Sequence, residues 1–152
     1  MDESKDTDSY NDSKMMELIQ NTKDAEELNY IMNELSREYD ILSKESNIKL
    51  AQLAELQDAK KTIEEIESVK DKKSLIPLGA GVLAFGQITN STMVLLSIGA
   101  GYIIEANIEE AKQHLKAKSD ALNGEMERIS KKKKSLSDML SKAAYRENMG
   151  NI

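Results

Sequence analysis

Two long segments of the chain carry apolar residues at every seventh position. In the first segment the series consists of Leu28, Leu35, Leu42, Leu56 and Ile63. In the second segment it consists of Ile108, Leu115, Leu122, Ile129, Leu136 and Ala143. A seven-residue apolar repeat sustained over several heptads is typical of helices that pair in a coiled coil. The pattern predicts one helix over residues 14–73 and a second over residues 106–148.

The two helices are expected to form an antiparallel hairpin, because the segment between them is too short to separate them. With Lys72 placed opposite Asn107, the polar residues Ser46 and Lys49 of the first helix face residues 130–133 of the second. The second helix is also polar there, in a stretch that includes most of the Lys131–Lys134 run. This agreement supports antiparallel pairing and predicts a weakened zone partway along the helix pair.

The segment between the helices has a different pattern, which repeats itself once. Ser74–Ile104 contains no charged residue, the only proline, Pro77, and five of the seven glycines. Leu75–Leu83 aligns with Leu95–Ile103, and each copy is an apolar run, a Gly-Ala-Gly turn and a second apolar run. Short loops that contain glycine connect β-hairpins. The repeat predicts two hairpins joined by a turn at Thr89–Thr92, with strands near residues 75–78, 82–88, 93–98 and 102–105.

A capping motif marks the predicted start of the second helix. Asn107 is followed three residues later by Glu110, a spacing at which each side chain can bond the backbone N–H of the other residue.

The predicted strands are apolar on both faces, so both faces need cover. Two isolated hairpins with bare edges cannot supply it. We therefore expect the centre to be a body through which several subunits assemble. The residues expected to form this body are Leu75, Ile76, Leu78, Gly79, Gly81, Val82, Leu83, Phe85, Val94, Leu96, Ile98, Gly99, Gly101 and Ile103.

The composition favours an elongated helical protein over an ordinary globular one. The 152 residues include 21 basic and 27 acidic side chains, and only 4% are aromatic. The absence of cysteine excludes disulfides, thiolate catalysis and cysteine zinc sites. Residues 1–13 are acidic and lack the apolar stretch of a secretory signal. They are predicted to form a disordered leader of a cytoplasmic protein, and residues 149–152 a disordered tail.

No group of residues predicts catalysis, a cofactor or a metal site. Gly79–Gly81 lacks the third glycine and the following helix of a dinucleotide-binding loop. His114 is the only histidine, too little for a triad or a zinc site. The adjacent carboxylates Glu64–Glu65 and Glu109–Glu110 point about 100° apart on a helix, so neither pair forms a dyad that shares a proton.

Two further functions are not favoured by the sequence. Lys131–Lys134 wraps around a helix in an acidic chain without nearby aromatic residues, so a solvated run is favoured over a nucleic-acid site. The uncharged centre is interrupted by Gln87 and the polar Thr89–Thr92, and each apolar half is shorter than the roughly 20 residues of a membrane span. We therefore expect neither a nucleic-acid partner nor a membrane.

Flexible apolar residues gather near the predicted free ends of both helices, at Met15, Met16, Met139, Leu140, Tyr145 and Met149. Methionine adapts to partners of varied shape. Two interpretations stay open: a surface for varied partners, or coiled-coil residues at fraying ends. The predicted register leaves residues 14–30 as an overhang without a partner helix.

The order of long helix, two hairpins and long helix resembles the α-type subunit of prefoldin. Leu75–Gly81, answered by Ser97–Gly101, is similar to that family's hairpin signature, and Glu109-Glu110-Ala111 fits its second helix. The resemblance implies an α+β fold: a long antiparallel coiled-coil hairpin whose two central β-hairpins form a β-barrel body between subunits. It further implies a heterohexamer of two α-type and four β-type subunits that captures unfolded polypeptides without ATP and delivers them to a group II chaperonin.

The resemblance also assigns the contacts with unfolded clients to apolar residues near the helix ends. They are Met15, Met16, Leu18, Ile19, Met139, Leu140 and Tyr145. The acidic leader and the long first helix depart from the family pattern. The alternative is a coiled-coil scaffold or spacer that oligomerises through its central hairpins and binds one defined partner.

Overall fold

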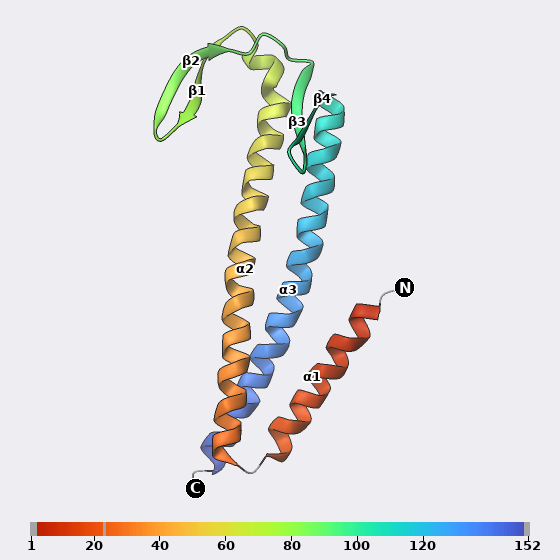
Figure 1. Ribbon diagram of the computed structural model, residues 1–152, viewed down its shortest axis with the longest axis vertical. Helices are drawn as coiled ribbons and strands as arrows, with labels where there is room; N and C mark the ends of the chain where they lie inside the picture. Colours follow the sequence, from red (N-terminus) through yellow and green to blue (C-terminus); the bar gives the residue numbers. More distant parts are fainter. Residues whose placement is uncertain (1–2, 23, 151–152) are drawn as a thin grey trace. The chain divides into compact units, whose positions relative to one another are not determined.

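The structure, a computed structural model, describes residues 3–22 and 24–150, with side chains from Asn11 onward (Figure 1). The elements are α1 (Glu3–Asn21), α2 (Ala25–Glu65), a 3-10 turn (Ile66–Val69), β1 (Lys73–Gly79), β2 (Val82–Gln87), β3 (Met93–Gly99), β4 (Tyr102–Asn107) and α3 (Ile108–Gly150). These elements confirm the predicted α+β class. The chain divides into two compact units: a helical unit, Met1–Lys49 with Gly124–Ile152, and a hairpin unit, Leu50–Asn123.

The helical unit is built around an apolar cluster to which three helices contribute. We call it the three-helix cluster; it consists of Ile19, Leu28, Ile31, Leu35, Leu136, Met139 and Ala143. Leu28 and Leu35 come from the first heptad series, and Leu136 and Ala143 from the second. Both series therefore point inward, as a coiled-coil pattern requires.

The first predicted helix, over residues 14–73, is instead two helices: α1 ends at Asn21 and α2 begins at Ala25. Asp24 caps α2: its Oδ1 accepts a hydrogen bond of 2.9 Å from the backbone N–H of Glu26. The Glu27 carboxylate accepts a second bond from the Thr22 hydroxyl. An aspartate before the first turn of a helix satisfies free backbone N–H groups and so favours a new helix start there.

The backbone of α1 is helical from Glu3, whereas the sequence predicted a disordered leader over residues 1–13. Residues 11–13 already carry side-chain contacts, since the Ser135 hydroxyl donates a hydrogen bond of 2.6 Å to Asp12 Oδ2. In place of the predicted overhang over residues 14–30, α1 turns back and Ile19 enters the three-helix cluster. The predicted tail also differs, because α3 continues to Gly150; residues 1–2 and 151–152 lie outside the described residues.

Within the helical unit α2 and α3 run antiparallel, as predicted, but in a different register. Ser46 and Lys49 contact Met126 and Glu125, where the predicted register placed residues 130–133. The predicted register assumed that the first helix runs to residue 73. In the structure α2 ends at Glu65 and is followed by the 3-10 turn, so the first helix is about two turns shorter at this end than predicted. The facing positions on α3 shift accordingly.

The hairpin unit contains the two predicted hairpins as separate two-stranded antiparallel sheets, β1–β2 and β3–β4. Both hairpins follow the same plan. The register shifts between Pro77 and Gly79 in one and between Ser97 and Gly99 in the other, so each has a bulge just before its turn. The internal repeat in the sequence is thus a repeat of structure.

Each hairpin turn consists of two residues, Ala80-Gly81 and Ala100-Gly101, rather than the three that we predicted. The φ angles are 49° and 80° in both turns. Two positive φ angles in succession match the twist of the strands that they join, and glycine takes such angles without steric cost. This backbone requirement explains why the Gly-Ala-Gly motif occurs twice.

Side-chain caps fix both ends of the second hairpin. Asn90 Oδ1 accepts hydrogen bonds from the backbone N–H groups of Thr92, at 2.9 Å, and Met93, at 3.1 Å, which shapes the turn into β3. The predicted capping box is confirmed: Glu110 N donates to Asn107 Oδ1 and Asn107 N donates to Glu110 Oε2, each at 2.9 Å. The chain therefore passes from β4 directly into α3.

The three-helix cluster leads to a prediction about stability. Leu136→Ala should lower the free energy of unfolding of the helical unit by about 2–5 kcal/mol, because Leu136 is buried between helices and the truncation leaves a cavity. Ile41→Ala is the matched control, since Ile41 is 56% exposed on α2; it should cost less than about 1 kcal/mol. Urea unfolding followed by helical circular dichroism measures both, and equal costs would contradict the assignment of the cluster.

Candidate functional site

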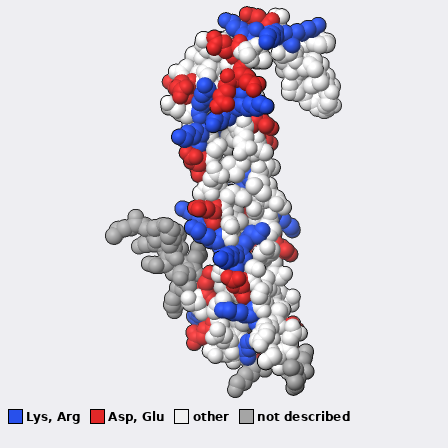
Figure 2. Space-filling view, turned by 180° about the vertical axis from the view of Figure 1, so that it is seen from behind, with Lys and Arg blue, Asp and Glu red and all other residues white. Residues whose placement is uncertain are grey.

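The first hairpin presents apolar side chains on both faces. Leu75 pairs with Phe85 on one face and Ile76 pairs with Ala84 on the other. Phe85 is 75% exposed, and Leu75 and Ile76 are exposed as well. Figure 2 shows this hairpin as an almost uninterrupted white surface, because Lys73 is its one charged residue. A soluble chain rarely leaves such a patch in water, so this surface is a candidate interface.

The second hairpin is partly covered on one face. Val94 pairs with Ala106, which is buried, and Leu96 pairs with Ile104. On the opposite face Leu95 is 72% exposed. The face that carries Leu95 is therefore the better candidate for contact with another subunit.

Most of the residues that the sequence predicts to form the assembly surface are exposed. Twelve of the fourteen are exposed, and Val94 and Leu96 are half-buried. The structure adds four exposed apolar residues that the sequence analysis did not select: Met93, Leu95, Tyr102 and Ile104. The signal for them was present, since all four belong to predicted strands whose two faces are apolar.

The predicted client-contact residues fall into three groups in the helical unit. Leu18 and Tyr145 are exposed. Met15, Met16 and Leu140 are half-buried against the three-helix cluster. Ile19 and Met139 are fully buried within it, which corrects the expectation that both are accessible near the helix ends. The reason is the position of α1, which covers the surface where the sequence predicted an overhang.

Other exposed apolar residues of the helical unit were missed by the sequence analysis. Tyr30, Ile41 and Ile48 on α2 are exposed and lie outside the heptad series. Tyr30 and Ile41 line a hollow beside the three-helix cluster. The heptad pattern selects inward positions, so it passes over an outward-facing side chain.

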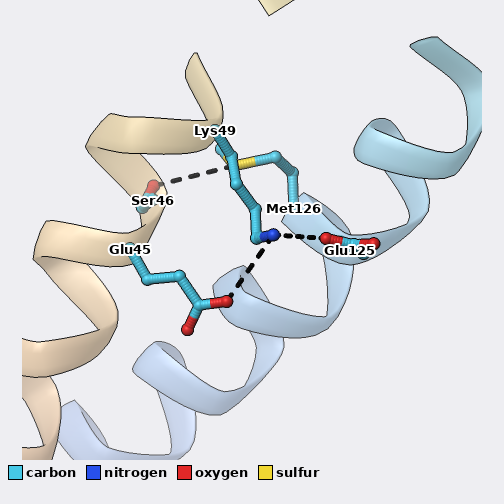
Figure 3. Close-up of polar contacts among 5 residues, drawn as sticks. All are labelled: Glu45, Ser46, Lys49, Glu125 and Met126. Atoms are coloured by element: carbon cyan, nitrogen blue, oxygen red, sulfur yellow. Dashed lines mark hydrogen bonds and ion pairs between the residues drawn. The ribbon is translucent and has the colours of Figure 1, made fainter. Parts of the chain in front are cut away.

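A polar group interrupts the pairing of α2 with α3, as the sequence predicted for Ser46 and Lys49 (Figure 3). Lys49 Nζ donates a hydrogen bond to Glu125 and lies 3.7 Å from a carboxylate oxygen of Glu45. Ser46 Oγ lies 3.9 Å from the sulfur of Met126. The hydrogen bond to the Glu125 carboxylate raises the pKa of Lys49, because it stabilises the charged ammonium group.

Two residues of the Lys131–Lys134 run contact α2. Lys132 Nζ lies 2.7 Å from the Glu38 carboxylate, and Lys133 Nζ lies 4.9 Å from the centre of the Tyr39 ring. A cation over an aromatic face is attracted by the ring electrons. These two lysines therefore join the helices instead of lying free in solvent.

Neither the histidine nor the described carboxylates form a chemical site. His114 is half-buried, and its Nε2 is buried without a hydrogen-bond partner. Among the described residues, no group of three or more acidic or histidine side chains could hold a metal ion. In the same part of the chain, no helix is both long enough and apolar enough to cross a membrane.

The pattern of two glycine-turned hairpins between long helices agrees with a known family. The family model described as prefoldin subunit matches residues 35–149. The chain belongs to the prefoldin family. Members of this family are chaperones rather than enzymes, and the match includes both hairpins and all of α3 except its last residue.

Individual relatives point to the α-type branch of this family. The chain is 29% identical to prefoldin subunit alpha of Pyrococcus horikoshii over 134 residues, which cover 83% of this chain and 89% of that one. It is 33% identical to prefoldin subunit alpha of Thermococcus onnurineus, over 60% of this chain and 69% of the relative. Human prefoldin subunit 5 is 32% identical over 68% of each chain.

A solved structure supports the fold. A chain of filamentous prefoldin from Methanocaldococcus jannaschii aligns with a TM-score of 0.65 at 17% identity, over 72% of this chain and 92% of that one. That protein is an assembly of prefoldin subunits, so the family fold is one that oligomerises with other subunits.

The polar group around Lys49 leads to a prediction about pH. Because the pKa of Lys49 is raised in the folded protein, its stabilisation is complete below the ordinary value of 10.5 and disappears as the pH rises through the folded value. Lys49→Met should therefore destabilise the helical unit near neutral pH, with a difference from wild type that shrinks above pH 10.5.

The measurement is urea unfolding at several pH values. Lys44→Met is the matched control, because it removes an exposed lysine from the same helix. If the two variants lose stability equally at every pH, the Lys49–Glu125 hydrogen bond has no effect on folding.

Proposed function

We propose that this chain is an α-type subunit of an ATP-independent holdase that captures unfolded polypeptides and delivers them to a group II chaperonin. Its partners in the assembly would be β-type prefoldin subunits, two α with four β, with the central hairpins joined in a β-barrel. The observation that carries the proposal is the pair of apolar hairpins whose open faces are left uncovered by their own chain. Family membership supplies the class of activity.

Burial of the hairpins would be the driving force for assembly. Removing apolar surface from water contributes about 25 cal/mol per Å². The outer edges of β1, β2, β3 and β4 also carry backbone groups without a strand partner, because each sheet has only two strands. Pairing those edges with other subunits would satisfy them, as closure of a barrel does.

Capture of clients would take place on the helical unit. Leu18 and Tyr145 are exposed there, and Met15, Met16 and Leu140 are half-buried beside them. Each such contact is weak, but several helical units on one body bind a client with much higher avidity. The net charge of −6 would keep the assembly soluble while these side chains are exposed. We propose the cytoplasm as the compartment, in keeping with a chain that lacks cysteine.

Assembly is tested by one substitution on the hairpin. Phe85→Asp should weaken assembly with β-type subunits by at least about thirtyfold, because it places a carboxylate at the most exposed apolar position. Gln87→Asp is the control, since it adds the same charge on the same strand face. Sedimentation velocity measures both; normal assembly of Phe85→Asp would contradict the role of this hairpin.

Client capture is tested by light scattering from a diluted, chemically unfolded test protein without ATP. The chain with β-type subunits should suppress aggregation at near-stoichiometric amounts. Tyr145→Ser should lower the suppression about two- to fivefold, because it removes an exposed aromatic contact. Ile48→Ser, which removes an exposed apolar side chain elsewhere on α2, should leave it unchanged.

Two other results would count against the proposal. An intact assembly that never suppresses scattering would favour the scaffold alternative. Equal losses for Tyr145→Ser and Ile48→Ser would contradict the location of the client site.

A further inference from the structure

The first helix covers an apolar surface that α2 and α3 form together. Ile19 of α1 is 0% exposed, and it lies in one cluster with Ile31 of α2 and Met139 of α3. Met15 and Met16 pack against the same cluster. The side chains of α2 and α3 that surround Ile19 would therefore face water if α1 left.

In the part of α1 whose side chains are described, from Asn11 onward, the apolar attachment to α2 and α3 is short. Its apolar side chains at helical spacing are Met15, Met16 and Ile19, and the residues before them are almost all polar. Two polar contacts flank this stripe: Ser135 donates to Asp12 at 2.6 Å, and Arg146 donates to the backbone carbonyl of Ile19. A helix held over so short a stretch opens more readily than the helices that it covers.

Charged side chains flank this apolar contact. Asp12 and Lys14 of α1 line one hollow with Glu38 of α2 and Lys132 of α3, and Glu38 and Lys132 form an ion pair of 2.7 Å with each other. The surface under α1 therefore fits an amphipathic helix with charged residues beside its apolar stripe. The family match begins at residue 35, so α1 is an addition to the matched part of the chain.

We propose that α1 is an intramolecular competitor for clients. In this proposal the surface of α2 and α3 that holds Ile19 is itself a client site. It takes amphipathic helical segments that present aliphatic or methionine side chains three and four residues apart beside charged residues. The inference rests on the proposed function, since it concerns the polypeptides that the holdase captures. A client gains this site only when α1 leaves it.

When α1 competes with a client, the apparent affinity of the protein for the client equals the affinity of the open site multiplied by the fraction of molecules in which the site is open. If α1 is docked in nine molecules out of ten, the apparent affinity for a client falls about tenfold. Weakening the docking of α1, with the exposed client contacts Leu18 and Tyr145 left in place, should therefore strengthen client binding.

The deciding variant is Ile19→Glu, and its matched control is Gln20→Glu. Both add one carboxylate to α1, but Ile19 is buried while Gln20 is exposed. The full chain, assembled with β-type subunits, is titrated into fluorescein-labelled, reduced and carboxymethylated α-lactalbumin. Ile19→Glu should bind the probe about five- to tenfold more tightly than wild type, and Gln20→Glu within about twofold of it.

A second variant protects the test against damage to the cluster. Ser135→Ala removes the hydrogen bond to Asp12 and leaves every apolar contact in place. It should tighten binding about twofold, since one hydrogen bond contributes about 0.5 kcal/mol or more. If Ile19→Glu speeds hydrogen exchange in residues 136–143, that substitution has disturbed the cluster. The affinity of Ser135→Ala for the probe then tests the inference in its place.

Hydrogen exchange of the wild-type assembly measures directly whether a client displaces α1. Addition of the probe should speed exchange of the amides in residues 12–21, because the client replaces α1. Unchanged or slower exchange there, or unchanged affinity of the deciding variant, would overturn the inference while leaving the holdase function intact. Failure of the wild-type assembly to bind the probe at all would overturn the holdase function, and the inference with it.

Discussion

The constraint on which the proposed assembly depends is that the hairpin unit cannot cover its own apolar surface. Two separate two-stranded sheets carry large apolar side chains on their open faces, and each strand has an unpaired edge. The Gly-Ala-Gly turns hold these strands in tight hairpins, with the same φ angles in both copies. The glycines of both turns therefore shape the surface that the proposed assembly would cover.

The helical unit meets a similar requirement within one chain. Its apolar surface on α2 and α3 is covered by α1, and Ile19 is as buried as a residue of a globular core. If clients displace α1, as we propose, this cover is exchanged for a client. The helical unit would then bind transiently, whereas the hairpin unit would take part in permanent assembly.

Much of this structure could be predicted from the sequence, because several patterns have only one physical solution. The heptads of Leu28 and Leu136 required a buried seam, the repeated glycines required two hairpins, and Asn107 with Glu110 formed the expected cap. The break before α2 was missed, although Asp24 followed by Glu27 has the spacing of a capping box. The fold-back of α1 was not predictable from its periodicity, since a short stripe of two methionines and an isoleucine does not specify a partner. The predicted register of α2 against α3 was wrong because the α-helix ends before Ile66–Val69. Ile66 follows Ile63 at a spacing of three residues, so the apolar pattern does not reveal this end.

The most direct test of the uncovered hairpins is hydrogen exchange of the backbone amides in residues 75–104, with the chain alone and in its assembly with β-type subunits. In the chain alone, the amides on the open edge of each strand have no strand partner and should exchange rapidly. In the assembly they should exchange far more slowly, in step with the burial of Phe85 and Leu95. Equal exchange in the two samples, with the assembled mass confirmed, would show that these hairpins are not the surface through which the subunits join.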